Sequence, residues 1–189
     1  MNEWCNIIEI ASKSYTCGFC GNQIASDKGY ITKDGLSEIY ICHKCNKPTY
    51  FDRYNNKIPG TLYGKEFKVN IPKDIQQIYN EARKCFSVGA YSAVNMCCRK
   101  LLMHIAVECG ADENLKFIEY VNYLDTENYI PKNSKKWVDI IRNKGNQTNH
   151  EINISDENDA KQLIKFIEIL ITLIYEIQLE ISEGEHDGV

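Results

Sequence analysis

The longer, C-terminal part of the chain has the hydrophobic pattern of helices. After Pro72, which suits a first helical turn, apolar residues recur at helical spacing, and Gly89 and Gly110 interrupt the pattern. The pattern predicts helices over residues 72–89, 90–109 and 113–124, a short helix between Pro131 and Gly145, and a last helix from Ser155 to about Ile181. The predicted inward positions are Ile75, Ile78, Tyr79, Ala82, Phe86, Val94, Cys97, Leu101, Ile105, Leu115, Ile118, Val121, Leu124, Trp137, Ile140 and Ile141.

The N-terminal part has the pattern of short strands and turns. Aromatic and β-branched residues at 30–32 and 38–41 flank Lys33-Asp34-Gly35, which is typical of a hairpin turn. Residues 51–71 contain Pro59-Gly60 and Gly64 without apolar periodicity, which indicates a linker. We therefore expect an α+β chain that is mainly α: a small β domain over 1–50, a linker over 51–71, an all-α bundle over 72–182 and an acidic tail over 183–189.

Four cysteines carry the clearest chemistry in the chain. Cys17, Cys20, Cys42 and Cys45 form a C-x2-C-x21-C-x2-C pattern, which suits one tetrahedral Zn²⁺ held by four thiolates. Gly21 and Asn46 follow the two pairs and can take a positive φ, so that backbone amides turn toward sulfur. The pattern predicts a zinc ribbon with a structural metal, because four thiolates close the shell; unliganded thiols are the alternative.

The remaining cysteines and His43 have plainer interpretations. Cys85, Cys97, Cys98 and Cys109 lie on predicted helices, where a buried apolar role is the default, and Cys98 beside Arg99 is the candidate for a reactive thiol. His43 lies between two predicted ligands and is expected at the surface. The N-terminus shows no secretory signal, so the nine cysteines indicate a reducing cytoplasm and metal binding rather than disulfides.

Charge and hydropathy exclude several classes of function. The net charge of −4 argues against broad electrostatic binding to nucleic acid, although a local basic groove at Lys132, Lys135, Lys136, Arg142 and Lys144 remains open. The apolar stretch 163–181 is interrupted by charged and amide residues, which favours a buried helix over a membrane span. The chain has no Walker or Rossmann motif, so no nucleotide cofactor is expected.

Several segments resemble a known family. They are Ile71-Pro72-Lys73-Asp74-Ile75, residues 79–85, Gly89-Ala90-Tyr91, residues 98–102, and Ile141-Arg142-Asn143-Lys144-Gly145-Asn146 ending at His150. Together these resemble the bacterial domain-of-unknown-function family 4145, which is usually grouped with the HEPN superfamily of helical bundles. A zinc ribbon before such a domain is a recurrent arrangement, so the resemblance implies a HEPN-like bundle over most of residues 70–180.

The HEPN resemblance also implies a candidate active site. Many HEPN proteins are metal-independent ribonucleases, often toxins or antiphage effectors, whose Arg, polar and His positions match Arg142, Asn143 and His150 here. In that role Arg142 would stabilise charge on the phosphate, His150 would transfer a proton, and two copies would meet in a homodimer. Seven residues separate Arg142 from His150, more than the HEPN pattern usually has, and Met103 stands where the family pattern has Glu.

Two main hypotheses of different class follow, and a mostly structural dimer is a third possibility. In the first, the chain is a zinc-containing, HEPN-like interaction module of a bacterial or phage defence system that forms a homodimer and binds protein or RNA. In the second, it is a metal-independent endoribonuclease that uses Arg142, Asn143 and His150. In the non-enzymatic case Arg142 would bridge helix ends and His150 would hold the turn between Gly145 and Glu151.

Overall fold

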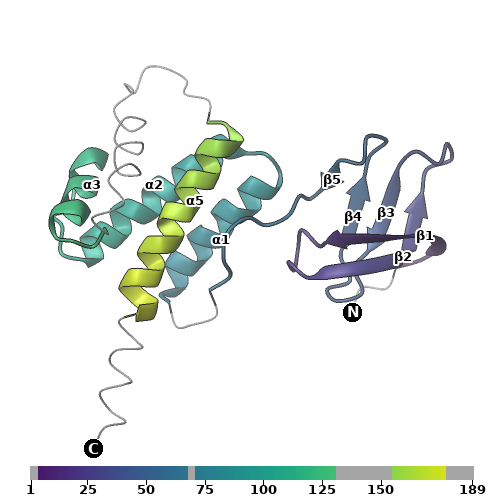
Figure 1. Cartoon of the computed structure of the whole chain (residues 1–189), viewed down its shortest axis with the longest axis horizontal. Helices are drawn as coiled ribbons and strands as arrows, with labels where there is room; N and C mark the ends of the chain where they lie inside the picture. The colour runs from purple at the N-terminus through teal and green to yellow at the C-terminus, as the bar shows by residue number, and fades with distance from the viewer. Residues whose placement is uncertain (1–3, 68–70, 131–154, 178–189) are drawn as a thin grey trace, which may run out of the picture. The chain divides into compact units, whose positions relative to one another are not determined.

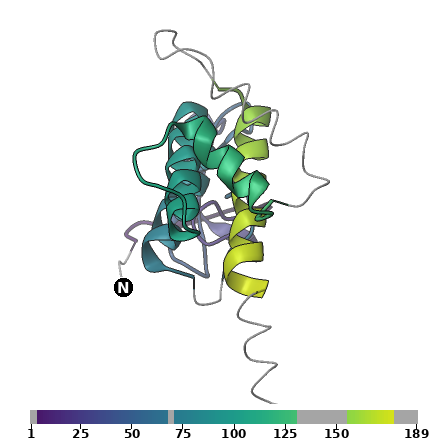
Figure 2. The same cartoon turned by 90° about the vertical axis from the view of Figure 1, so that its left-hand side faces the viewer.

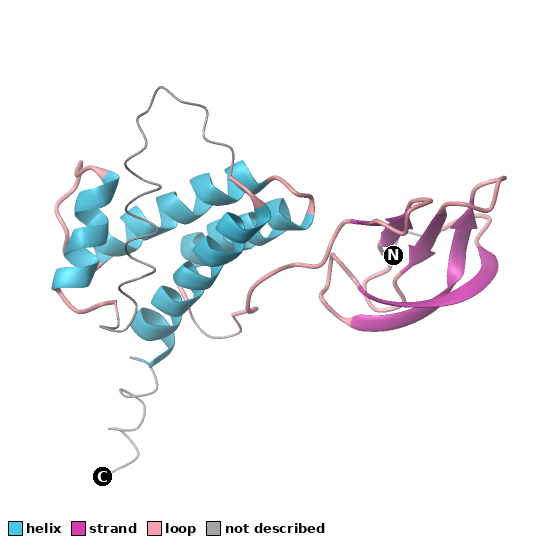
Figure 3. Cartoon of the chain, turned by 45° about the horizontal axis from the view of Figure 1, so that its top comes forward, coloured by secondary structure: helices cyan, strands magenta, loops and turns pink. Residues whose placement is uncertain are grey.

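The computed structural model describes residues 4–67, 71–130 and 155–177, and the chain divides into two compact units between Leu62 and Tyr63. The first unit is a sheet and the second is helical (Figure 1, Figure 3). The prediction of an α+β chain that is mainly α is therefore confirmed. Each unit has a core of its own, so we describe them separately.

The first unit is a five-stranded antiparallel meander in which strand order follows sequence order. Its strands are β1 (Ile8–Thr16), β2 (Gln23–Ile31), β3 (Glu38–Ile41), β4 (Pro48–Phe51) and β5 (Lys57–Ile58). The predicted hairpin joins β2 to β3, where Ile31 pairs with Glu38 and Gly35 takes a φ of +70° in the turn. The side chain of Asp34 accepts hydrogen bonds from Thr32 Oγ1 and Leu36 N, which fixes that turn.

One face of the sheet packs a small core. The buried residues are Tyr15, Cys17, Ile24, Tyr40, Cys42 and Phe51, and three aromatic rings form its centre. The ring of Phe51 lies 5.3 Å from that of Tyr15 and 5.8 Å from that of Tyr40. Two of the six buried residues are cysteines, so the core is too small to be stabilised by apolar burial alone.

The opposite face of the sheet carries a row of apolar side chains. Tyr30 pairs with Ile39, Ile39 with Tyr50, and Tyr50 with Ile58, so these residues lie side by side across four strands. Successive side chains alternate between faces, which sets this row opposite to Tyr40 and Phe51. Tyr50 and Ile58 are exposed, and Tyr30 and Ile39 are half-buried.

The second unit is built from four α-helices in its described part. They are α1 (Lys73–Ser87), α2 (Tyr91–Glu108), α3 (Phe117–Thr126) and α5 (Glu157–Ile171), and α5 continues into the π-helical segment η2 (Thr172–Glu176). Helix α2 is central, because it packs against α1, α3 and α5 (Figure 1, Figure 2). Asp156 caps α5 by accepting a hydrogen bond of 2.8 Å from Asp159 N.

One helix prediction needs correction, and two others lie wholly or partly outside the described residues. Helix α3 begins at Phe117 rather than near Glu113, because Asn114 has a φ of +63° and Glu119 accepts a hydrogen bond of 2.6 Å from Lys116 N to cap the later start. The short helix with Trp137, Ile140 and Ile141 falls outside the described residues, as does the last helix beyond Ile177.

The core of the helical unit largely follows the predicted period. Of the predicted inward positions, Ile75, Tyr79, Ala82, Val94, Leu101, Ile105, Val121 and Leu124 are fully buried. On α2, however, Cys98 is buried at 1% exposure, whereas the predicted Cys97 is half-buried. On α3, Phe117 and Tyr120 are buried, whereas the predicted Leu115, which precedes the helix, and the predicted Ile118 are half-buried.

The segment that the sequence assigned to a linker contributes to both units. Phe51 and β5 belong to the sheet, whereas Phe67 and Ile71 are buried in the helical core. Arg83, itself buried, donates hydrogen bonds of 3.1 Å to the carbonyl oxygens of Tyr63 and Gly64. The start of the second unit is therefore a strap that α1 holds in place.

On the other side of this strap, α5 supplies a second anchor. Glu168 on α5 is buried and accepts a hydrogen bond of 3.0 Å from Lys65 N. Lys165 Nζ lies 2.5 Å from the other carboxylate oxygen of Glu168, so the buried charge is paired. Gly64 lies between these anchors with a φ of +89°, and a Cβ at this position would lie 2.6 Å from Tyr79 Oη and 2.8 Å from Ile164 Cγ2.

We expect Gly64→Ala to destabilise the helical unit strongly. Gly89→Ala is the matched control, because Gly89 also has a positive φ but has open space around its Cα. The control should lose about 1–2 kcal/mol of unfolding free energy from backbone strain alone. Gly64→Ala should lose about 1–3 kcal/mol more, because the added methyl group overpacks the core. Urea unfolding followed by helical circular dichroism measures both, and equal losses would contradict the strap geometry.

Candidate metal centre

The four cysteines of the predicted metal site lie on two knuckles with the same backbone geometry. Gly21 N donates to Cys17 O at 2.9 Å, and Asn46 N donates to Cys42 O at 2.7 Å. Cys17 N in turn donates to Asn22 O at 2.9 Å, and Cys42 N donates to Lys47 O at 3.0 Å. Each pair of cysteines is thus held in a tight turn directly after a strand, the first after β1 and the second after β3.

A left-handed residue closes each knuckle. Gly21 has a φ of 69° and Asn46 has a φ of 56°, as the residue types at these positions predict. Phe19 N donates to Cys17 Sγ at 3.4 Å, so that at least one backbone amide points toward sulfur. Amide donors stabilise a charged thiolate, which is the form that binds metal.

The two knuckles bring the four sulfur atoms together. Cys17 Sγ lies 3.7 Å from Cys45 Sγ, Cys20 Sγ lies 3.8 Å from Cys42 Sγ, and all four sulfurs lie within 4.8 Å of one another. These separations are far longer than the roughly 2 Å of a disulfide bond. A tetrahedral ion with metal–sulfur distances of about 2.3 Å would put its sulfurs about 3.8 Å apart. The four cysteines could therefore hold a metal ion.

The electrostatics of the cluster also suit a cation. Burial raises the pKa of Cys17, and it raises the pKa of Cys45 to about 12. Burial also opposes ionisation of Cys20, but hydrogen bonds from Asn22 and neighbouring thiols outweigh it and lower that pKa to about 7. Without a cation the cluster would hold mostly neutral thiols, whereas a bound divalent ion would stabilise four thiolates.

The ligand set has the closed form of a structural site. Cys17 and Cys42 are fully buried, and Cys20 and Cys45 are half-buried. Four sulfurs complete a tetrahedral shell and leave no position for a substrate or a reactive water. His43 is exposed, in agreement with its expected place at the surface.

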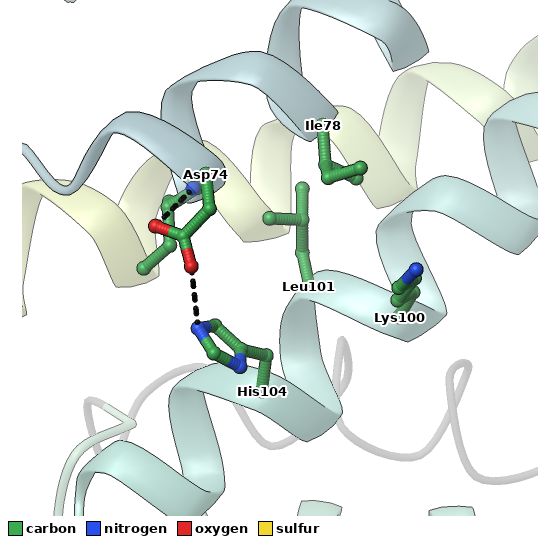
Figure 4. A pocket seen from close by; sticks show the side chains of 6 residues that line it. Asp74, Ile78, Lys100, Leu101 and His104 are labelled. Carbon is green, nitrogen blue, oxygen red and sulfur yellow. Dashed lines mark hydrogen bonds and ion pairs between the residues drawn. The ribbon is translucent and has the colours of Figure 1, made fainter.

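A second cluster, which the sequence did not reveal, lies between α1 and α2. A groove with a volume of about 270 Å³ is lined by Asp74, Ile75, Ile78, Lys100, Leu101 and His104. In Figure 4, Asp74 on α1 points toward His104 on α2, and Ile78 and Leu101 lie beside this pair. Asp74 Oδ2 lies 3.2 Å from His104 Nε2. The groove thus combines an apolar floor with a polar rim.

The polar rim extends to a third element. Glu108 Oε1 lies 3.4 Å from the same His104 Nε2, and Tyr175 on η2 donates a hydrogen bond to the other carboxylate oxygen of Glu108. Burial and the Glu108 carboxylate raise the pKa of Tyr175, so its hydroxyl stays protonated. The helical spacing of His104 and Glu108 is visible in the sequence. Their contact with Asp74 is not, because it depends on how α1 turns back onto α2.

Most other candidate residues from the sequence lie outside the described part of the chain, and Cys98 lies inside it. Arg142, Asn143 and His150 lie outside the described residues, as do Lys132, Lys135, Lys136 and Lys144. For Cys98 the default of a buried, apolar role is confirmed over the alternative of a reactive thiol, because the thiol is buried and burial raises its pKa well above the usual range. The guanidinium of Arg99 instead lies 3.8 Å from the centre of the Phe117 ring, where it packs rather than activating the thiol.

Comparison with known proteins identifies the helical part. A family model described as Domain of unknown function (DUF4145) matches residues 80–183, more than half of the chain, so the chain belongs to this family. The family expected from the resemblance is thereby confirmed. Neither the curated proteins nor the solved structures gave a match. Within the described residues, every helix is too short or too polar to cross a membrane.

We expect Cys42→Ser to abolish metal binding and to unfold the sheet while the helices remain. The sheet core is small and shares Cys17 and Cys42 with the metal site, whereas the helical unit has an extensive core. Cys5→Ser is the control, because Cys5 is exposed and stands apart from the cluster. Metal content per chain and amide hydrogen exchange report the two effects. A metal-free variant whose sheet amides stay protected would contradict the prediction.

Proposed function

We propose that this member of the DUF4145 family is a zinc-containing, HEPN-like interaction module of a bacterial or phage defence system. The observation that carries the proposal is the convergence of four thiols at the separations a tetrahedral zinc site requires. Zinc in this site is structural, since the closed shell offers it no catalytic position. The metal holds the sheet as a rigid platform, and the helical bundle supplies a second body.

The chemistry of the ligands favours zinc over other ions. Soft thiolates exclude magnesium and calcium, and tetrahedral sulfur sites in proteins hold zinc or iron. Zinc has no redox chemistry, which suits a site whose only task is to stabilise a fold. The supporting observations are the burial of Cys17 and Cys42 and the repeated knuckle geometry around them.

An interaction role is also supported by an exposed surface of the sheet unit. The row Tyr30, Ile39, Tyr50 and Ile58 leaves apolar side chains exposed on a sheet that is already small. The resemblance to HEPN bundles supports a homodimer formed through the helical unit. Protein and RNA are both candidate partners for such a module. Because the chain has a net charge of −4, an RNA partner would have to bind at a small basic surface rather than across the whole protein.

The alternative function is a metal-independent endoribonuclease. It is supported by the match of Arg142, Asn143 and His150 to the HEPN positions, with guanidinium stabilising the phosphate and imidazole transferring the proton. The seven-residue gap between Arg142 and His150 counts against it. We therefore rank the interaction module first.

Elemental analysis tests the zinc assignment directly. Full-length protein that is purified without added metal should carry one zinc ion per chain and no iron. X-ray absorption should show four sulfur neighbours at about 2.3 Å. Iron at this site would overturn the structural-zinc proposal, because iron–sulfur coordination brings redox chemistry with it.

The two functions predict opposite results for Arg142→Ala and His150→Ala. In the interaction module, wild-type protein should leave single-stranded RNA intact, and each variant should change thermal stability but no activity. In the ribonuclease, wild-type protein should cleave RNA in the presence of a chelator, and each variant should lose cleavage with little change in melting temperature. Light scattering on the same samples should show a homodimer. Chelator-resistant cleavage that both variants lose would reverse our ranking.

A further inference from the structure

We propose that the knuckle surface, defined as Phe19, His43, Lys44 and Lys47, binds single-stranded nucleic acid. The proposal rests on the proposed interaction module, since the metal holds both knuckles in place. It goes beyond that function by naming the surface and the chemical class of the partner.

The first observation is an exposed aromatic ring at the tip of the first knuckle. Phe19 lies between two metal-ligand positions, and 42% of its surface is exposed. Lys47 Nζ, which follows the second knuckle, lies 5.0 Å from the centre of this ring. The lysine therefore places a positive charge beside an accessible aromatic side chain, as a nucleotide with a base and a phosphate requires.

The second observation is the charge of the chain around the metal site. Residues 10–26 and 39–51, which contain both knuckles, include no Asp or Glu, although the whole chain has 26 acidic residues. Lys44 and Lys47 are exposed, and so is His43, which can donate a further hydrogen bond. This part of an acidic protein is thus locally basic, which fits an anionic partner.

The charge of a metal site would explain only part of this excess of lysines and lack of acidic residues. One divalent ion with four thiolates carries about −2, which would repel acidic side chains and attract lysines. Lys57 already places a positive charge near the site, because it is half-buried and donates a hydrogen bond of 2.6 Å to the oxygen of Thr16, the residue before Cys17. Lys44 and Lys47 are exposed instead, so that they are accessible to phosphates.

Single-stranded nucleic acid fits this surface better than a duplex or an acidic peptide. An unpaired base exposes the face that Phe19 can stack on, whereas a duplex hides it. An acidic peptide would use the lysines but would gain little from the aromatic ring. The surface offers one ring and two lysines, so we expect micromolar or weaker affinity that falls with salt.

Fluorescence anisotropy with zinc-loaded, full-length protein tests the proposal. The probe is a labelled oligothymidylate of about 10 nucleotides, because DNA lacks the 2′-hydroxyl and cannot be consumed by a HEPN-type ribonuclease. Oligouridylate of the same length, and duplex DNA, complete the comparison. Metal content and sheet protection are measured for every variant, so that loss of binding is separated from loss of the ribbon.

The variants test the two contacts separately. Phe19→Ala should weaken binding about tenfold or more, because it removes the stacking platform. Lys44→Gln combined with Lys47→Gln should lower the slope of log affinity against log salt by about 1.4, or about 0.7 for each phosphate contact. The controls are Tyr54→Ala, which removes a ring that is 78% exposed elsewhere in the same unit, and Lys33→Gln.

Three outcomes would overturn the proposal. The first is a zinc-loaded wild type that binds none of the probes. The second is knuckle variants and controls that bind alike. The third is binding lost by Lys135→Gln with Lys136→Gln but not by the knuckle variants, which would move the nucleic-acid site elsewhere. In each case a correct zinc content would leave the structural-metal proposal standing, whereas absence of zinc would remove both.

Discussion

The first unit depends on the convergence of four cysteine sulfurs more than on any other interaction. Its apolar core has six buried residues, and Cys17 and Cys42 are two of them. The same side chains thus are core residues and candidate metal ligands. Packing of four neutral thiols within 4.8 Å of one another contributes little folding free energy, whereas binding of four thiolates to one cation would contribute a large amount. With the proposed zinc bound, metal–sulfur bonds would hold the strands and turns of this unit, which so small an apolar core could not do alone.

The helical unit has a different requirement: the irregular strap at residues 63–65 must be held against the helices. Arg83 and Glu168 are buried charged residues, and each makes hydrogen bonds to the backbone of residues 63–65 as well as to one polar side chain, Asn80 for Arg83 and Lys165 for Glu168. Such charges are tolerated because they are paired with polar groups that would otherwise be unsatisfied. The strap therefore begins the helical unit. Glycine is required at position 64, because the side chains of α1 and α5 leave no space there for a Cβ.

Sequence patterns predicted the features that depend on local chemistry. The cysteine spacing, Gly21, Asn46 and the hairpin turn at Gly35 each have a short-range cause, and all of them are found in the structure. The helical period located α1, α2 and the start of α5 for the same reason.

The features that the sequence missed depend on tertiary contacts. A capping interaction between Lys116 and Glu119 overrode the apolar period and moved the start of α3. The groove with Asp74 and His104 exists because two helices turn back on each other, which no spacing within either helix reveals. Residues 51–71 looked like a linker because their contacts are with distant parts of the chain, such as Glu168, and show no period of their own.

The four cysteines belong to the first unit and the helices to the second, so one proposed function would depend on bound zinc and the other would not. Binding at the knuckles would require the proposed zinc, because Phe19 and Lys47 lie in the two turns that carry the four cysteines. A reaction at Arg142 and His150 would require only the helical unit, whose core contains none of the four metal ligands. A chelator should therefore remove the first function and spare the second. Since one chain can carry both, a mixed result, in which cleavage persists but binding to single strands weakens, would assign nucleic-acid capture to the ribbon and chemistry to the bundle.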